Sequence, residues 1–207
     1  VLVAAALLAS SGVPGLALPR GSRAGEALSV AFAVAGAALG LFAAAQALAV
    51  GPGPGLDLPW SLPGGRLRVQ VDALSAFFLV PIFLMAALGS VYGLGYWPAA
   101  GRPESAARLR AFYGLLPAAM AVLVSARNAL LFLCAWEVMA LAAYFLMATE
   151  DESAEVREAA WFYLVATHAG TLLLMAGFGV LCAATGSFDL PTAVALGPGP
   201  ANAVFLL

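Results

Sequence analysis

Long apolar runs, separated by short polar stretches, constrain this chain more than any other feature. Six runs cover residues 1–18, 27–50, 73–97, 112–125, 129–148 and 159–184, and a seventh begins near residue 201. A helix needs about 20 apolar residues to cross a bilayer core, and most runs approach that length. The runs also lack the period-two alternation of barrel strands. The sequence therefore predicts an all-α, polytopic transmembrane helix bundle with six spans and the start of a seventh.

The composition agrees with a lipid-facing surface. Hydrophobic residues make up 63% of the chain and charged residues 10%, whereas soluble domains have about 45–50% and about 25%. A surface in lipid needs no charges. The net charge of -2 and the scattered arginines exclude nucleic acid as a partner. Cys134 and Cys182 lie in apolar runs without metal-binding spacing, so we expect both to be small buried side chains.

Two local patterns predict finer structure. Residues 66–72 alternate polar and apolar side chains after the glycine–proline tract at 51–55, which indicates a short extramembrane strand or hairpin. Glycines at a spacing of four, Gly36 with Gly40 and Gly89 with Gly93, are typical of closely packed membrane helices.

The arginines predict a topology. The loops after the first, third and fifth runs carry Arg20, Arg23, Arg102, Arg108, Arg110 and Arg157. The loops after the second and fourth runs carry only Arg66, Arg68 and Arg127. The positive-inside rule then places the first set in the cytoplasm and the amino terminus outside.

Glu137 is the acidic residue that lies deepest in an apolar run. It stands near the middle of 129–148, where an ionised side chain costs about 2.5–3.5 kcal/mol. A partner, a water-filled cavity or protonation must offset that cost. Low dielectric favours the neutral acid, so such a carboxyl can take up and release protons and serve in a proton relay. The alternative is a neutral glutamic acid that hydrogen-bonds between helices.

His168 and Tyr144 are the other candidate proton-transfer residues. His168 is the only histidine, beside Thr167 and near Thr171; its imidazole titrates near neutral pH and suits either a relay or a bond to a neighbouring helix. Tyr144 shares a helix side with Glu137 and suits either a hydrated path or an interfacial anchor. Arg127 lies about 15 Å along the helix from Glu137, too far for direct pairing.

The sequence carries no other recognisable chemistry. It contains no glycine-rich phosphate loop, no cysteine–histidine metal cluster and no nucleophile–base pair. We therefore expect no cofactor, no metal and no catalytic centre in this chain.

Four stretches resemble the antiporter-like membrane subunits of complex I and its relatives. Residues 71–78 resemble the start of the third helix of that family, and 132–146, with Trp136 and Glu137, resemble the fifth helix and its mid-membrane glutamate. Residues 159–171 and 185–189 resemble most the group 4 hydrogenase branch, as in hydrogenase 4 and formate hydrogenlyase.

The resemblance implies a proton-translocating subunit without redox centres. It would work with other membrane subunits, and with peripheral redox subunits carrying the metal centres, in the inner membrane of a prokaryote. The family pairs its glutamate with a lysine in the seventh helix, but this chain contains no lysine, so only Glu137 carries over.

The domain expectation follows from the same resemblance. Residues 1–207 are one incomplete transmembrane domain, an amino-terminal fragment in which 1–97 hold three spans with an external loop at 51–70. Residues 110–207 begin the first antiporter-like helix repeat. Two other functions stay open: a subunit of a multisubunit sodium/proton antiporter, and a purely structural membrane subunit.

Overall fold

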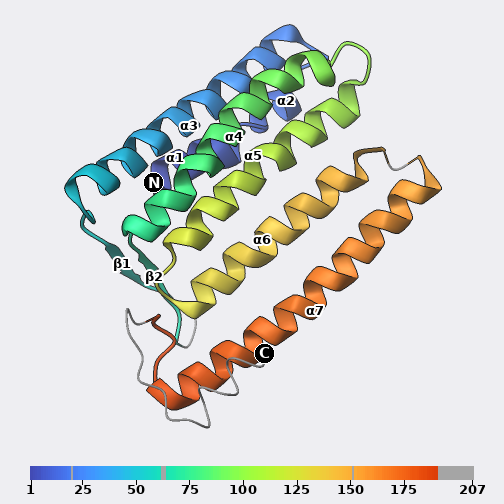
Figure 1. Cartoon of the computed structure of the whole chain (residues 1–207). Coiled ribbons are helices and arrows are strands. Elements are labelled where there is room, and N and C mark those ends of the chain that lie inside the picture. Colours follow the sequence, from blue (N-terminus) through green and yellow to red (C-terminus); the bar gives the residue numbers. More distant parts are fainter. Residues whose placement is uncertain (20, 62–63, 151, 191–207) are drawn as a thin grey trace.

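A computed structural model describes residues 1–19, 21–61, 64–150 and 152–190. Five long helices lie side by side in sequence order, each antiparallel to the one before it (Figure 1). They are α3 (Arg23–Val50), α4 (Ala73–Tyr96), α5 (Pro103–Ser125), α6 (Ala129–Met147) and α7 (Ala154–Thr185). The short helices α1 (Leu2–Ser10) and α2 (Val13–Ala17) pack against α3 and α5. A 3-10 turn, η1 (Ala148–Glu150), joins α6 to α7.

The first apolar run forms a helix that is interrupted near its middle. The helix breaks after Ser10 and restarts at Val13. Pro14 explains the break, because it lacks an N–H and its ring clashes with the carbonyl four residues earlier. The described residues therefore contain five helices long enough to cross a membrane, plus the interrupted apolar segment Leu2–Ala17. The predicted seventh run lies outside the described residues.

Small residues let the helices of the first half approach closely. Alanines of α1, α3, α4 and α5 form most of the core, around the fully buried Phe83. A Cβ on Gly36 would stand 3.0 Å from the Ala4 carbonyl oxygen of α1, and one on Gly40 would collide with the Phe83 ring. Gly89 lies against the Tyr113 hydroxyl, whereas Gly93 has no atom within 4 Å of such a Cβ. Three of the four predicted packing glycines therefore contact another helix.

The predicted hairpin is present and ties three parts of the chain together at one end of the bundle. Strands β1 (Leu56–Pro59) and β2 (Arg66–Val69) pair antiparallel. Single bridges then join Val69 to Ala126, and Asn128 to Asp189. Arg68 Nη1 lies 3.2 Å from Asp189 Oδ2. The hairpin, the α5–α6 turn and the segment after α7 thus form one layer (Figure 1).

A charge cluster at the same end holds the start of α4. Arg127 Nη2 lies 2.7 Å from Asp72 Oδ2, and Asp72 caps α4 by accepting from the Ser75 N–H at 2.7 Å. Partial burial opposes the charged form of Asp72. The Ser75 hydrogen bonds and the Arg127 charge outweigh this and lower the pKa of Asp72. Arg127 is therefore paired locally and does not approach Glu137.

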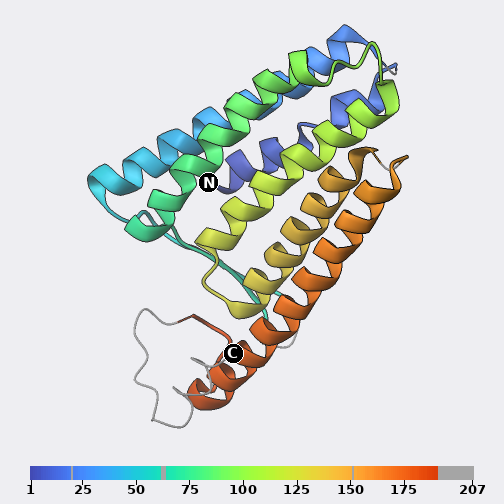
Figure 2. The same cartoon turned by 45° about the vertical axis from the view of Figure 1, so that its right-hand side comes forward.

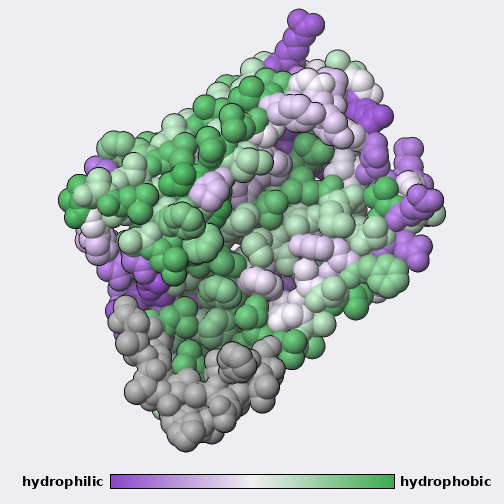
Figure 3. All heavy atoms as spheres, in the orientation of Figure 1, coloured by the Kyte–Doolittle hydropathy of each residue, from purple (hydrophilic) through white to green (hydrophobic). Residues whose placement is uncertain are grey.

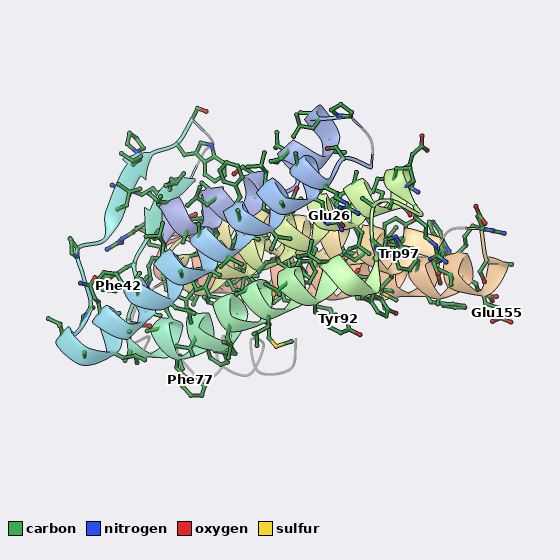
Figure 4. The ribbon with its side chains drawn as sticks, turned by 90° about the horizontal axis from the view of Figure 1, so that it is seen from above. Glu26, Phe42, Phe77, Tyr92, Trp97 and Glu155 are labelled. Carbon is green, nitrogen blue, oxygen red and sulfur yellow. The ribbon has the colours of Figure 1, made fainter. Side chains whose placement is uncertain are left out.

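The opposite end contains a buried ion pair that the sequence analysis missed. Arg110, which was predicted to be a loop charge, lies inside α5 and pairs with Glu26 of α3. Their side chains are only 11% and 14% exposed. Glu26 also accepts from the Ala99 N–H at 3.2 Å, and Arg110 donates to the Trp97 carbonyl at 3.1 Å. Glu26 and Trp97 accordingly lie near each other in Figure 4. The pair joins α3 and α5 to the α4–α5 loop.

The outer surface suits lipid. Apolar side chains cover the middle of the face in Figure 3, while hydrophilic residues gather toward the ends of the helices. Phe77 and Tyr92 of α4 point away from the bundle in Figure 4. Cys134 is exposed and Cys182 partly exposed, so the prediction that both are buried is wrong. The reason is physical: a lipid-facing apolar surface accepts a thiol without protein around it. The chain is a multi-pass membrane protein.

Candidate functional site

Helix α6 holds Glu137 at mid-span. The helix begins at a strong cap, because the Asn128 side chain, 1% exposed, accepts from the Leu130 and Leu131 N–H groups at 3.1 and 3.4 Å. At 1.5 Å per residue, Glu137 lies about 12 Å from one end of α6 and about 15 Å from the other. Glu137 therefore lies near the middle of the helix.

Helix α7 brings His168 to Glu137. The two helices run antiparallel as neighbours (Figure 2), and His168 Nε2 lies 3.4 Å from Glu137 Oε2. The Glu137 side chain is 32% exposed and that of His168 48%. Two residues predicted separately as proton carriers are thus in direct contact.

The His168 ring has an assigned tautomer. Its Nδ1 lies 2.9 Å from the Leu164 carbonyl oxygen on the same helix. Because a carbonyl only accepts, Nδ1 carries a proton in both the neutral and the charged ring. The other nitrogen, Nε2, is then the acceptor of the neutral ring, and it is the nitrogen that faces Glu137.

Glu137 has one oxygen in contact and one without a partner. Oε1 is buried and accepts no hydrogen bond within the described part of the chain. A protonated Glu137 can donate from Oε2 to His168 Nε2, and an ionised Glu137 can pair with the imidazolium. The contact therefore supports both protonation states without a change of partner.

A second polar contact crosses the same helix interface beside the first. The Trp136 indole Nε1 donates to Thr171 Oγ1 at 3.1 Å. Thr171 in turn donates to the Thr167 carbonyl oxygen at 3.1 Å. The sequence analysis used Trp136 only for the family resemblance and missed this bond. Its sequence signal is a tryptophan next to the mid-helix glutamate, with a threonine one turn after the histidine.

Tyr144 does not join this pair. It lies edge-on against Phe145, with ring centroids 5.1 Å apart, and among the described residues its hydroxyl makes no hydrogen bond. The structure thus brings Glu137 and His168 together and leaves Tyr144 apart. In the same part of the chain, no group of three or more histidine, cysteine, aspartate or glutamate residues is arranged to hold a metal.

Comparison with known proteins relates this chain to a family. The family described as "NADH:quinone oxidoreductase/Mrp antiporter, TM" matches residues 126–205, which include Glu137 and His168. Hydrogenase-4 component B of Escherichia coli strain K12 is 32% identical over 143 residues, covering 68% of this chain and 21% of that protein. The chain belongs to the antiporter-like membrane subunits related to complex I.

Other similarities of this antiporter-like subunit extend over more of the chain. An uncharacterized protein of Mycobacterium tuberculosis strain H37Rv is 32% identical over 185 residues, covering 89% of this chain and 28% of that protein. A chain of the membrane-bound sulfane sulfur reductase, an archaeal respiratory membrane complex, shares the fold with a TM-score of 0.67 at 19% identity. That match covers 91% of this chain and 39% of the other. The antiporter-like subunit thus spans 28% of the length of the mycobacterial relative and 39% of the length of the archaeal chain.

Proposed function

We propose that this chain contributes Glu137 and His168 to a proton-translocating subunit, which couples electron transfer in partner proteins to proton movement. The observation that carries the proposal is the 3.4 Å contact between the two side chains at mid-span. Both lie within the residues that match the family. Mid-membrane ionisable residues are rare and mark proton or ion pathways.

The transfer step follows from the tautomer. A proton on Glu137 Oε2 passes to His168 Nε2, which leaves a carboxylate and an imidazolium; the reverse step restores the neutral pair. Because Nδ1 donates to Leu164 O, which cannot take up a proton, the histidine gains and loses protons at Nε2. His168 therefore stores a proton beside Glu137 and returns it. Tyr144, partly buried further along α6, is the third residue that we propose for the path.

The partners are proposed from the relatives. Hydrogenase-4 component B is by name a component of a hydrogenase, which supports a hydrogenase or an NADH:quinone oxidoreductase-like assembly for this chain. In such an assembly peripheral redox subunits carry the metal centres, and other membrane subunits cover the exposed helices. The chain itself would add no catalytic centre. Residues 1–97 would form three spans with the loop 51–70 outside, and 110–207 would begin the helix repeat.

A sodium/proton antiporter is the second candidate function. The description of the matching family names the Mrp antiporter beside NADH:quinone oxidoreductase, and the Glu137–His168 pair serves either function. Proton movement that requires sodium and no electron donor would favour this candidate. A purely structural role is the third, in which Glu137 only hydrogen-bonds between helices.

We also propose a prokaryotic inner membrane with the amino terminus outside. Val1 lines the same cavity as Leu56 and Val69 of the hairpin, so the amino terminus and the hairpin share an end. The opposite end carries Arg23, Arg102 and Arg157, which supports a cytoplasmic location. The variant Arg66→Cys should react with an impermeant maleimide in whole cells. The variant Arg102→Cys should react only after lysis. The reverse labelling pattern would show that the amino terminus lies in the cytoplasm.

The experiment that tests the function uses the full gene product in its native complex, in sealed vesicles. Proton movement driven by the electron donor should be lost in Glu137→Gln, which keeps the shape of the side chain but carries no exchangeable acid. Glu155→Gln, in the exposed first turn of α7, is the matched control and should leave proton movement intact. Undiminished movement in Glu137→Gln, with normal assembly, would leave Glu137 a structural residue.

A further inference from the structure

Among the described residues, helix α7 packs mainly against α6. Of its described residues only Ala160 and Thr171 are buried. Besides the Glu137–His168 contact, its side-chain interactions with α6 include the Trp136–Thr171 hydrogen bond at 3.1 Å and, further along the helix, the edge-on rings of Phe132 and Phe178, with centroids 5.4 Å apart. Lipid is as apolar as these side chains, so no hydrophobic force presses the two helices together. Specific contacts must set their register.

The Trp136–Thr171 bond stays the same through a proton cycle, whereas the Glu137–His168 contact does not. An indole N–H donates and does not titrate. The Thr171 hydroxyl proton is directed to the Thr167 carbonyl oxygen at 3.1 Å, which leaves an oxygen lone pair for the indole. The neighbouring pair alternates between a neutral hydrogen bond and an ion pair.

We propose that Trp136 and Thr171 are positioning residues that hold His168 Nε2 within proton-transfer distance of Glu137. This rests on the proposed function. Trp136 adjoins Glu137 on α6, and Thr171 lies one turn after His168 on α7, so the fixed bond crosses the interface beside the titrating one. At 3.4 Å the Glu137–His168 contact is already long for a hydrogen bond. A small rotation or slide of α7 would break it.

The substitutions remove the bond while keeping the packing. Trp136→Phe keeps a ring stacked near Phe132, whose centroid lies 6.3 Å from the indole, but lacks the N–H. Thr171→Val keeps the shape but lacks the oxygen, and Thr171→Ser restores the oxygen. Thr185→Val is the matched control, because the Thr185 hydroxyl bonds only within the carboxyl-terminal end of α7 and the residues just after it.

The readout is the infrared C=O stretch of protonated Glu137, followed over a pH titration of the full complex and assigned as the band lost in Glu137→Gln. A carboxylic acid that loses its histidine acceptor absorbs at higher frequency. We expect this shift in Trp136→Phe and Thr171→Val, its reversal in Thr171→Ser, and no shift in Thr185→Val. Donor-driven proton movement should fall about threefold or more, the effect of an average hydrogen bond between membrane helices.

The outcomes separate this inference from the proposed function. An unshifted band in both Trp136→Phe and Thr171→Val overturns the positioning role, even where Glu137→Gln abolishes proton movement. A shifted band combined with normal proton movement in Glu137→Gln upholds the positioning and overturns the function. Where Trp136→Phe fails to assemble, the comparison of Thr171→Val with Thr171→Ser decides, since these differ at one side chain that bonds across the interface. A band shifted equally in both Thr171 variants overturns the proposal.

Discussion

His168 Nε2 on α7 and Glu137 Oε2 on α6 lie 3.4 Å apart, and His168 Nδ1 is bound to the Leu164 carbonyl oxygen on the other side of the ring. One nitrogen is thus permanently a donor, and the second is reserved for the glutamate. Because the two nitrogens have separate partners, proton transfer at Nε2 requires both His168 and Glu137. Substitution of either residue should therefore have the same effect on proton movement.

Replacing His168 should reproduce the effect of replacing Glu137. His168→Gln fills similar space but carries no titratable group, so donor-driven proton movement in vesicles should fall about a hundredfold or more, within the range of positioned acid–base groups. The double variant Glu137→Gln with His168→Gln should be no worse than either single variant, because coupled residues are not additive. Multiplying losses would show two independent sites.

Removing Arg110 should destabilise the first half of the bundle. Arg110→Leu leaves the Glu26 carboxylate buried without its cation, which costs about 3–5 kcal/mol. Thermal unfolding in detergent measures the loss. The exchanged pair, Glu26→Arg with Arg110→Glu, should recover much of the stability. An exchanged pair that unfolds as early as Arg110→Leu would show that Trp97 and Ala99 determine the orientation of the charges.

Two glycines on neighbouring helices should respond differently to the same substitution. Gly40→Ala puts a methyl group into the Phe83 ring, and such overpacking costs about 1–3 kcal/mol. Gly93→Ala has open space and should unfold at the temperature of the unmodified protein or slightly above, since alanine favours helix. Equal midpoints for the two variants would contradict the close approach of α3 to α4.

The Asp72–Arg127 pair should add stability that disappears in acid. The pKa of Asp72 is lowered on folding, so the stabilising contribution is full above the unfolded pKa of about 3.9 and is lost as pH falls through the folded value. The carboxylate is 43% exposed, so solvent weakens the effect. Asp72→Asn keeps the helix cap. In this variant the unfolding temperature should depend less on pH between pH 5 and pH 3 than in the unmodified protein.

The matched variant Asp72→Ala separates the cap from the charge. It also removes the hydrogen bond to the Ser75 N–H and should cost about 1 kcal/mol more than Asp72→Asn at neutral pH. Equal stability of the two variants would show that the cap contributes little. An unchanged acid profile in Asp72→Asn would assign the pH dependence to another carboxylate.

Much of this fold is predictable because hydrocarbon imposes simple rules. Apolar runs of sufficient length gave α3, α4, α6 and α7 near their observed bounds, and alternation with glycine–proline signals gave the hairpin. The start of α5 was missed because Arg108 and Arg110 look like loop residues. A charge can enter a helix when a partner from a distant segment neutralises it, and Glu26 lies too far along the sequence to signal that.

The site shows the same division. Depth alone singled out Glu137, and rarity singled out His168, but their contact depends on the facing and register of two antiparallel helices. Residue spacing within one helix shows which residues share a side of that helix. It does not show which residues of a neighbouring helix face that side. For the same reason spacing grouped Tyr144 with Glu137, and it missed the Trp136–Thr171 bond, which exists only between helices.

The link between Arg68 and Asp189 sets an order of events during synthesis. The two residues are 121 positions apart, so at about 5–20 residues per second the hairpin emerges some 6 to 24 s before its last partner. Until then the Arg68 side chain can pair with Asp57, at 4.0 Å, and the hairpin can pair with the α5–α6 turn. The end layer therefore cannot be completed before α7 has been synthesised, and its completion requires α7 to cross the bilayer in the direction that returns Asp189 to the hairpin.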